Sequence, residues 1–355
     1  MREEAGGEWS FSTFSDRLTG YRLSAVLLLA HESGLLDLVA ARERPAAEIC
    51  EHIGWDSAYG RRFLDCLCEL EILHCEGERY GLSPAARPFL DPDSTSSQRR
   101  ALDFERQLFQ SWGQLDATLR AGGRVFATGE KPPEELARAR ARYLGAMDDA
   151  AVVRAEEVWQ CCAHLPERGT LLDLGAGSGA FIAAFLHRHP NWSALFCDLP
   201  EIVADEALHR RLRPWLARIG WCGCNLLDDG PSELDRIGER SCDLVLLSNL
   251  LHCQGAEESL RLLRRAAGKT SVDGVLLVHD FFADSDGRGA LYDLHMMLNT
   301  YNGRAHRLEA IVAAADRCGL PSQRRFSLPS GTTLLACARS DKPLRRMIAP
   351  TDSPA

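Results

Sequence analysis

The sequence predicts an α/β protein whose C-terminal half forms a mostly parallel seven-stranded sheet that ends in an antiparallel hairpin. From Gly169 onward, short apolar segments alternate with helical patterns, which is typical of parallel strands covered by helices on both faces. The first segment, Thr170 to Leu174, leads directly into three glycines at alternating positions. Between residues 45 and 82 the pattern is helix, turn, helix and β-wing, which predicts a winged-helix domain before the sheet.

Length and charge limit the class of protein. The 355 residues are enough for two cores, since a domain usually has about 100 to 200 residues. The formal net charge of −9 argues against binding to nucleic acid or to an anionic membrane, because both require a basic face. Met1 to Ser10 is polar and acidic, unlike a signal peptide, and the apolar run Leu23 to Leu29 is too short to span a bilayer. We therefore expect a cytoplasmic protein.

The 13 cysteines predict buried free thiols in a reducing compartment. Their number is odd, they lie in apolar periodic stretches, and no C-x-x-C pair occurs. Metal or disulfide roles remain the alternative. The histidines at 187 and 189 flank the end of a surface helix, and no carboxylate triad is spaced for a hard cation. The sequence therefore predicts no metal site.

The N-terminal segment is mainly helical. Residues 15–41 carry apolar side chains at helical spacing, so these helices face a core or a second subunit. A short helix is expected at 45–53, and Asp56 is a good N-cap for a longer helix at 57–70. Residues 72–75 and 79–82 then flank Glu76-Gly77 as the two strands of a wing.

DNA binding is the obvious interpretation of a winged helix, but the charges disfavour it. The expected recognition helix has Arg61 and Arg62, and it also has Asp65, Glu69 and Glu71 close by. Little net positive charge is left to attract phosphate groups. We expect no contact with nucleic acid.

The middle of the chain contains two longer helical patterns. A linker at 91–98 precedes an expected helix at 102–119, in which Phe109 and Trp112 share one face. After Gly122-Gly123 a helix is expected from about 134 to 161, with Met147 inside it. Ordinary core packing and the lining of a pocket are both open interpretations of this region.

The strands of the C-terminal half define the domain boundaries. They are expected at 170–174, 193–198, 218–223, 243–247, 274–280, 324–328 and 331–338, the last two joined by Pro329-Ser330-Gly331. The predicted domains are 1–100 (winged helix), 101–165 (helical connector), 166–340 (sheet domain) and 341–355, a disordered tail without periodicity.

The glycine loop predicts the ligand. A dinucleotide fingerprint reads G-x-G-x-x-G, whereas this loop reads D-x-G-x-G-x-G from Asp173 to Gly179. An acid at the head of the loop would repel a pyrophosphate, but it can hold an ammonium group. Asp198 ends the next strand, 19 residues after Gly179, where its carboxylate can accept both ribose hydroxyls. This combination favours S-adenosyl-L-methionine.

Several stretches together resemble a known family, the class I S-adenosylmethionine-dependent methyltransferases. These stretches are LLDLGAGSGAF, HPNWSALFCDLPEIV, CNLLDDG, DLVLLSNLLH and GVLLVHDFF. Within the class the chain is similar, over roughly residues 15–340, to the small-molecule O-methyltransferases related to caffeate and acetylserotonin enzymes and to bacterial natural-product enzymes. The resemblance implies a Rossmann-like catalytic domain. It also implies an N-terminal domain that forms a homodimer and helps to roof the partner's active site.

The cofactor-binding residues lie along the carboxyl edge of the expected sheet. Backbone groups of Gly175 and Gly177 should meet the amino-acid end of the cofactor, while Asp173 supplies charge for its ammonium group. Asp198 should bind the ribose, and Leu199 should pack beside the adenine.

Three further cofactor-binding positions depart from the family pattern. Asn225 and Leu226 stand where the family usually has Asp and Phe, and Asn225 can still accept the adenine amino group through its carbonyl oxygen. Leu226 keeps an apolar cover without aromatic stacking. Ser248 stands where many relatives have Lys, next to the cofactor.

His252 is the candidate general base, because it matches the first residue of the His-Asp-Trp run in the plant enzymes. A neutral imidazole near its ordinary pKa can accept a phenol proton at neutral pH. Here the run is His-Cys-Gln. Asp280 can supply one of the two acids that orient this histidine, whereas Ala305 stands at the other position. His279 and His306 are reserve bases.

The resemblance also implies an acceptor pocket. Its matching positions are Trp112, Met147, Met296 and Asn299, and two adjacent methionines at 296 and 297 suit an adaptable aromatic pocket. Core packing remains open for these residues. The predicted function is metal-free O-methylation of a small, aromatic hydroxyl in secondary metabolism. Three alternatives stay open: N- or C-methylation, a non-methylating reaction that retains the cofactor, and a winged-helix regulator that senses it.

Overall fold

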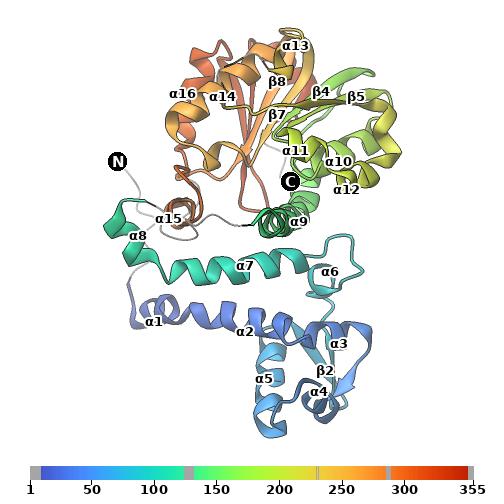
Figure 1. Cartoon of the computed structure of the whole chain (residues 1–355), viewed down its shortest axis with the longest axis vertical. Helices are drawn as coiled ribbons and strands as arrows, with labels where there is room; N and C mark the ends of the chain where they lie inside the picture. The colour runs from blue at the N-terminus through green and yellow to red at the C-terminus, as the bar shows by residue number, and fades with distance from the viewer. Residues whose placement is uncertain (1–8, 124–131, 229, 231, 285–288, 351–355) are drawn as a thin grey trace. The chain divides into compact units, whose positions relative to one another are not determined.

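The computed structural model describes residues 9–123, 132–228, 230, 232–284 and 289–350 (Figure 1). It divides between Arg106 and Gln107 into two compact units. This division lies inside helix α7 (Arg99–Trp112). Most of the stretch 101–165, expected as a separate connector, therefore belongs to the second unit. The two units are described separately below.

The first unit contains helices packed around a small sheet. The helices are α1 (Phe11–Thr19), α2 (Tyr21–Glu32), α3 (Leu35–Ala41), α4 (Ala46–Ile53), α5 (Ser57–Glu69) and α6 (Arg87–Leu90). The strands β1 (Arg44–Pro45), β3 (Arg79–Leu82) and β2 (Leu73–Glu76) pair antiparallel in that order. Asp56 caps α5 as expected, because its carboxylate accepts the N–H groups of Ala58 and Tyr59.

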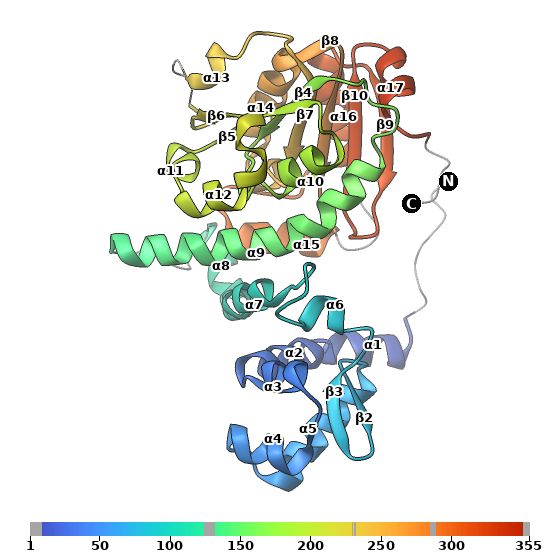
Figure 2. The same ribbon diagram turned by 90° about the vertical axis from the view of Figure 1, so that its right-hand side faces the viewer.

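Helices α4 and α5 approach each other closely at Gly60. A Cβ at this position would lie 2.3 Å from the Sγ of Cys50, so only glycine fits without a shift. The core of the unit is built from aliphatic side chains of α3, α4 and α5 and from the wing residue Tyr80, which is 1% exposed. The elements α4, α5, β2 and β3 are seen together in Figure 2. They form the expected helix, turn, helix and wing.

Helices α1 and α2 leave large apolar side chains exposed. The exposed side chains are Phe11, Phe14, Leu18, Tyr21, Leu23 and Leu29. Among the described residues no single helix is long and apolar enough to cross a membrane. One pair, Phe11–Glu32 with Leu35–Ala41, reaches the required length and composition only together and is bent by 65°. Leu28, Ala30, Leu35, Leu36 and Val39 of this pair are buried in the core.

The second unit is built on a seven-stranded sheet with the order β6-β5-β4-β7-β8-β10-β9. Its strands are β4 (Gly169–Leu174), β5 (Trp192–Asp198), β6 (Ile219–Gly223), β7 (Cys242–Ser248), β8 (Thr270–Asp280), β9 (Ser322–Ser327) and β10 (Thr333–Ala338). Strands β4 to β8 pair parallel, and β10 pairs antiparallel with both β8 and β9. Each lies close to its expected position.

The strand order creates the binding crevice. From β4 the sheet grows to one side through β5 and β6, and β7 and β8 then extend it on the other side. Ligands of open α/β sheets bind at the carboxyl ends of the strands where this reversal occurs. The loops after β4 and β7 therefore mark the expected site.

Helices cover both faces of this sheet (Figures 1 and 2). Helices α9 (Pro133–Gln160), α10 (Ala180–Arg188) and α17 (Asp341–Met347) contribute to one buried cluster. Helices α14 (Ala256–Lys269) and α16 (Leu308–Arg317) contribute to the cluster on the other face. The sheet strands are therefore buried on both sides, which explains their nearly continuous apolar sequences.

Shorter elements complete the second unit. They are α8 (Leu115–Ala121), α11 (Pro200–Val203), α12 (Glu206–Arg211), η1 (Arg213–Arg218), α13 (Glu233–Arg236), η2 (Leu251–Cys253) and α15 (Gly289–Asn299). The helix expected at 102–119 is interrupted, because α7 ends at Trp112 and α8 begins at Leu115. Gly113 lies at the break, in keeping with the low helix propensity of glycine.

The prediction of a disordered tail from residue 341 is wrong for residues 341–350. Helix α17 buries Pro343, Leu344 and Met347 against the sheet. Beyond it, the guanidinium of Arg324 donates hydrogen bonds to the carbonyls of Ile348 and Ala349. Two turns of helix contain too few residues for an apolar period to be recognised. Residues 351–355 lie outside the described part of the chain.

Candidate active site

The glycine loop after β4 is held against the end of β5. Gly175, Gly177 and Gly179 all have positive φ, at 77°, 54° and 72°, which other residues rarely adopt. The N–H of Gly175 donates to the carbonyl of Cys197 at 2.8 Å. The N–H of Gly177 donates to the Oδ2 of Asp198 at 2.7 Å. The loop and the ribose-binding candidate are thus one hydrogen-bonded unit.

Asp173 heads this loop with an unsatisfied carboxylate oxygen. The residue is 1% exposed, and its Oδ2 has no hydrogen-bond partner among the described residues. Burial, and then the charge of Asp198, raise the pKa of Asp173 to about 8. A buried acid of this kind gains free energy from a cationic ligand, since an ammonium group satisfies the oxygen and restores the ionised form. The site therefore fits the ammonium end of S-adenosylmethionine.

Asp198 and Leu199 end β5 beside the loop. Each carboxylate oxygen of Asp198 accepts one backbone N–H at 2.7 Å, from Gly177 and from Leu199. The oxygens keep further lone pairs for ribose hydroxyls. Burial raises the pKa of Asp198, and the two N–H donors oppose this shift. The side chain of Leu199 is 39% exposed, so an apolar surface is free to receive the adenine.

Asn225 and Leu226 follow β6. The Oδ1 of Asn225 accepts the N–H of Leu227 at 3.1 Å, and its Nδ2 donates to Asp228 at 2.9 Å. This carbonyl oxygen retains a lone pair for an adenine amino group. Leu226 is only 7% exposed and belongs to the buried cluster on the α14 side of the sheet.

Ser248 supports a neighbouring histidine. Its Oγ lies 2.8 Å from the Nδ1 of His279. The next residue, Asn249, has a left-handed backbone with φ of 51°. Its Oδ1 is buried without a partner among the described residues. Sequence reasoning placed Ser248 and Asn249 together at the carboxyl edge of the sheet and assigned a cofactor contact only to Ser248; the left-handed backbone of Asn249 is seen only in the structure.

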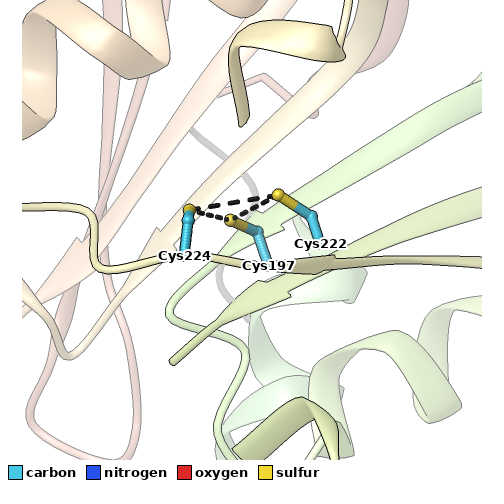
Figure 3. Close-up of side chains that lie close together, drawn as sticks. All are labelled: Cys197, Cys222 and Cys224. Atoms are coloured by element: carbon cyan, nitrogen blue, oxygen red, sulfur yellow. Dashed lines mark hydrogen bonds between the residues drawn. The ribbon is translucent and has the colours of Figure 1, made fainter. Parts of the chain in front are cut away.

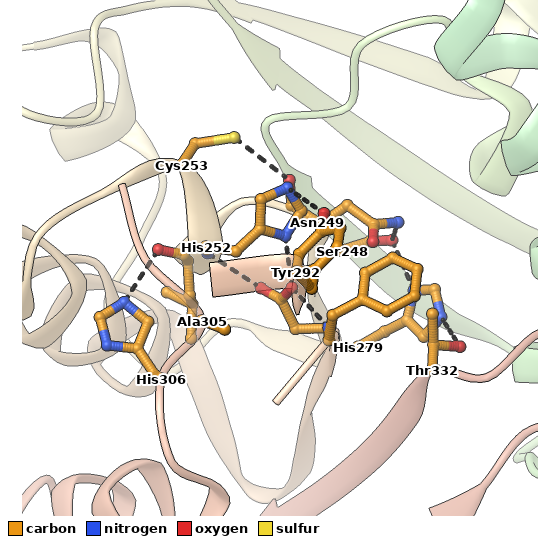
Figure 4. A network of polar contacts seen from close by, with 12 residues as sticks. Ser248, Asn249, His252, Cys253, His279, Tyr292, Ala305, His306 and Thr332 are labelled. Carbon is orange, nitrogen blue, oxygen red and sulfur yellow. Dashed lines mark hydrogen bonds and ion pairs between the residues drawn. The ribbon is translucent and has the colours of Figure 1, made fainter. Parts of the chain in front are cut away.

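His252, which is labelled in Figure 4, forms a buried pair with Asp280 at the carboxyl edge of the sheet. The Nδ1 of His252 lies 2.5 Å from Asp280 Oδ1, and the His252 N–H donates to Asp280 Oδ2 at 3.2 Å. Burial lowers the pKa of His252, but the adjacent Asp280 carboxylate outweighs burial and raises it overall. The structure thus supplies the acid partner that the altered His-Cys-Gln run had put in doubt.

The other ring nitrogen of His252 faces Tyr292, which the sequence did not single out. The Tyr292 hydroxyl lies 3.2 Å from His252 Nε2, and the rings meet edge to face at 5.3 Å. Tyr292 is on α15, in a stretch without a recognisable motif. Its hydroxyl therefore lies beside the ring nitrogen of His252 that does not contact Asp280.

The two reserve bases have structural hydrogen bonds instead. His279 is fully buried between Ser248 and Thr332, with 2.8 Å from its Nε2 to the Thr332 Oγ1 (Figure 4). Burial lowers the pKa of His279 to about 3, so the ring is neutral. The Nε2 of His306 lies 3.0 Å from the carbonyl of Leu251 and 2.9 Å from the Oγ of Ser259. Both rings hold the loop that carries His252.

The predicted acceptor residues gather partly around His295. Trp112 stacks on the His295 ring with a centroid distance of 6.3 Å. The Nδ2 of Asn299 donates to the His295 carbonyl at 2.9 Å, and its Oδ1 accepts the Ser111 hydroxyl. Met296 is 6% exposed on the same helix. Met147 is half-buried on α9.

A cavity of about 810 Å³ adjoins His295, but Trp112, Met147, Met296 and Asn299 are not among the residues that line it. Its wall includes Phe281, Tyr292 and His295, together with Thr332 from the loop between β9 and β10. Phe281 packs on Tyr292 at 4.3 Å, and Tyr292 stacks on His295 at 5.9 Å. A volume of this size suits a small organic ligand. The wall of stacked rings favours an aromatic one.

The thiols of Cys197, Cys222 and Cys224 lie close together at the ends of β5 and β6 (Figure 3). The Sγ of Cys197 lies 3.4 Å from those of Cys222 and Cys224, and all three residues are buried and free. Among the described residues this is the one group with three ligand atoms close enough to hold a metal ion. Cys197 and Cys222 are register partners on β5 and β6, so sequence spacing alone did not predict the contact. Small apolar thiols also pack well in such a core.

Comparison with known proteins decides the family. Residues 120–319 match an O-methyltransferase domain, and residues 15–92 match an O-methyltransferase dimerisation domain. The chain belongs to the S-adenosylmethionine-dependent O-methyltransferases. The fold and family expected from the sequence are therefore confirmed.

Individual relatives of this O-methyltransferase cover nearly its whole length. The tetracenomycin polyketide synthesis 8-O-methyl transferase of Streptomyces glaucescens is 30% identical over 334 residues, which is 90% of this chain and 94% of the relative. An N,N-dimethyltransferase of Streptomyces rimosus is 27% identical over 274 residues, covering 75% of this chain and 77% of the relative. The structure of human N-acetylserotonin methyltransferase in complex with SAM has the same fold, with a TM-score of 0.75 at 21% identity, covering 95% of this chain and 100% of that one.

Proposed function

We propose that this enzyme methylates a hydroxyl group of a small aromatic metabolite, with His252 as the general base. Family membership supplies the reaction type. The observation that carries the finer proposal is the His252–Asp280 pair, which lies next to Tyr292 and an aromatic-walled cavity.

The cofactor site uses the residues at the carboxyl edge of β4, β5 and β6. Asp173 would hold the ammonium group, the loop at Gly175 and Gly177 the amino-acid end, and Asp198 the ribose. Leu199 would pack beside the adenine, and Asn225 would accept its amino group. When bound, S-adenosylmethionine supplies an electrophilic methyl group on a sulfonium, so the protein needs mainly to align the acceptor.

Two of the predicted cofactor contacts change their role in this proposal. Ser248 is bound to His279, and we assign it to positioning that ring. We assign the cofactor contact to Asn249 in its place, because the buried Oδ1 of Asn249 has no partner among the described residues. Leu226 acts as an apolar floor below the adenine pocket, since it is buried with core side chains.

The base works through its two differently bonded nitrogens. Asp280 accepts the Nδ1–H bond, which leaves Nε2 as the acceptor for the hydroxyl proton. The acceptor oxygen keeps the electron pair that forms the new bond. The Asp280 carboxylate stabilises the imidazolium formed. The acceptor hydroxyl would take the place at Nε2 that the Tyr292 hydroxyl contacts in this structure.

The test is direct. The purified protein is incubated with isotopically labelled S-adenosylmethionine and an extract of host metabolites, and products are identified by mass and fragmentation. We expect His252→Ala to lose turnover while cofactor affinity survives, and Asp198→Ala to lose affinity. Normal turnover by His252→Ala would show that the base assignment is wrong.

N-methylation is the second candidate, favoured by the relative from Streptomyces rimosus that is an N,N-dimethyltransferase. An amine acceptor also has to lose a proton, so His252 would keep its role. Fragmentation of the labelled product separates the two, because it locates the methyl group on oxygen or on nitrogen.

We propose in addition that two copies of the chain associate through α1 and α2. This segment lies within the match to the dimerisation domain, and it exposes Phe11 at 85% and Leu18 at 62%. Exposed apolar side chains that lie together on one surface are characteristic of an interface.

A further inference from the structure

Arg154 is a charged residue near the base that the mechanism does not use. It lies on α9, and its guanidinium carbon is 4.9 Å from the ring centroid of Phe281. Among the described residues it makes no hydrogen bond or ion pair. Two other arginines of the same helix do have carboxylate partners, Arg138 with Glu134 and Arg140 with Glu201.

The N–H groups of the partly buried Arg154 guanidinium have no acceptor among the described residues. Burial lowers the pKa of Arg154, while Tyr292, Glu157 and Asp280 oppose this shift. An arginine nevertheless stays protonated. The nearby acids have other partners, since Asp280 binds His252 and the Oε2 of Glu157 accepts the N–H of Ser330 at 3.2 Å. Both acids act on Arg154 electrostatically, but neither accepts its N–H groups. A carboxylate ligand would gain free energy by accepting these N–H groups.

Arg154 also lies within reach of the reacting position. The ring of Phe281 is 4.9 Å from the Arg154 guanidinium and 6.4 Å from the ring of His252. Because both distances are measured to the same ring, their sum is an upper limit for the separation of cation and base. A flat molecule of two fused rings, with a hydroxyl and a carboxylate at opposite ends, fits within that upper limit. Phe281 and Tyr292, which pack on each other at 4.3 Å, provide the surface beside it.

We propose that Arg154 binds a carboxylate of the acceptor, so that this enzyme acts on acidic aromatic hydroxyl compounds. The inference rests on the proposed function, because it places the hydroxyl at His252 and the carboxylate at Arg154. A carboxylate fits best because the planar guanidinium donates two parallel N–H bonds to its two oxygens. Phe281 holds the plane of the guanidinium by a cation–π contact.

The probes are 6-hydroxy-2-naphthoate and its methyl ester, which differ in charge and share the ring and the hydroxyl. Their Kd values are measured by calorimetry on the full chain with S-adenosylhomocysteine, so that no turnover is needed. The unaltered enzyme should bind the acid about 10- to 100-fold more tightly than the ester, the range for hydrogen bonds to charged groups.

The variants identify the residue responsible. Arg154→Met should remove the preference for the acid and leave the Kd of the ester unchanged, and Arg154→Lys should keep part of the preference. Arg142→Met is the matched control, since it removes an exposed arginine from the same helix, and it should retain the full preference. If Arg154→Met fails to fold, Arg154→Gln is measured in the same way.

Two results overturn the inference: equal Kd values for acid and ester in the unaltered enzyme, or a preference that survives in Arg154→Met. Failure of the proposed function looks different. In that case the acid is bound in an Arg154-dependent way, yet labelled methyl is never found on the oxygen of any acceptor.

Discussion

Replacing Asp280 with asparagine tests how the base is tuned. Asp280 is 1% exposed and receives bonds from the ring and the backbone of His252 and from the Phe281 N–H at 2.7 Å. Its charge is what holds the pKa of His252 above the ordinary value against the effect of burial. Asparagine keeps the shape and removes the charge, so the pKa of His252 should fall below its ordinary value.

The consequence is a shift of the pH-rate profile with a defined sign. A base must be neutral to accept a proton, so the rate of the unaltered enzyme should rise with pH through the raised pKa of His252. In Asp280→Asn this rise should occur at lower pH. The maximal rate should drop by about 10- to 100-fold, because a charge-assisted hydrogen bond contributes about 1.5 to 3 kcal/mol to stabilising the imidazolium.

The assay follows labelled methyl transfer as kcat and kcat/KM from acid to alkaline pH. Asp273→Asn is the matched control, because Asp273 is an exposed acid on the same strand β8, and it should leave the profile unchanged. If Asp280→Asn keeps the rise at the same pH, Asp280 does not tune His252 and the reasoning fails.

Two further predictions concern the cofactor and the interface. Since burial raises the pKa of Asp173 to about 8, affinity for S-adenosylhomocysteine should increase between about pH 6 and about pH 8.5, as the carboxyl ionises; Asp173→Asn should flatten this dependence in calorimetry, and an unchanged slope would exclude the ammonium contact. The double variant Leu18→Glu, Leu23→Glu places charge on exposed apolar positions of α1 and α2. It should be monomeric by light scattering coupled to gel filtration. A dimer that persists would show that the interface does not lie on α1 and α2.

The sheet could be predicted from the sequence because its strands are buried on both faces. Continuous apolar runs such as Leu171 to Leu174 leave few alternatives to a parallel strand, and the glycines after them identify the binding edge. Asp198 was chosen by its spacing from the glycine loop, and the structure places its carboxylate against that loop. Local sequence therefore predicted the fold, and it predicted which residues meet at the carboxyl edge of β4 and β5.

The acceptor side depends on contacts between distant segments. Strands β7 and β8 pair so that Ser248 lies opposite His279. This register brings Asp280, the residue after His279, next to His252 on the loop that follows Ser248. The sequence of either strand alone does not show how the two strands are aligned. His279 was taken for a reserve base because its hydrogen bond to Thr332 comes from the loop between the last two strands. Sequence analysis did not single out Tyr292 or Arg154, because their contacts also come from segments that are distant in the sequence.

Helix α17 has a practical consequence for handling the protein. Its buried side chains Leu344 and Met347 cover the sheet beside β8, β9 and β10, and the carbonyls after it are bound by Arg324. If the gene is shortened to end at residue 340, the apolar side chains of the second unit that α17 covers become exposed to solvent. The expressed protein would then tend to aggregate. Affinity tags at this end should therefore be joined after residue 350 through a spacer.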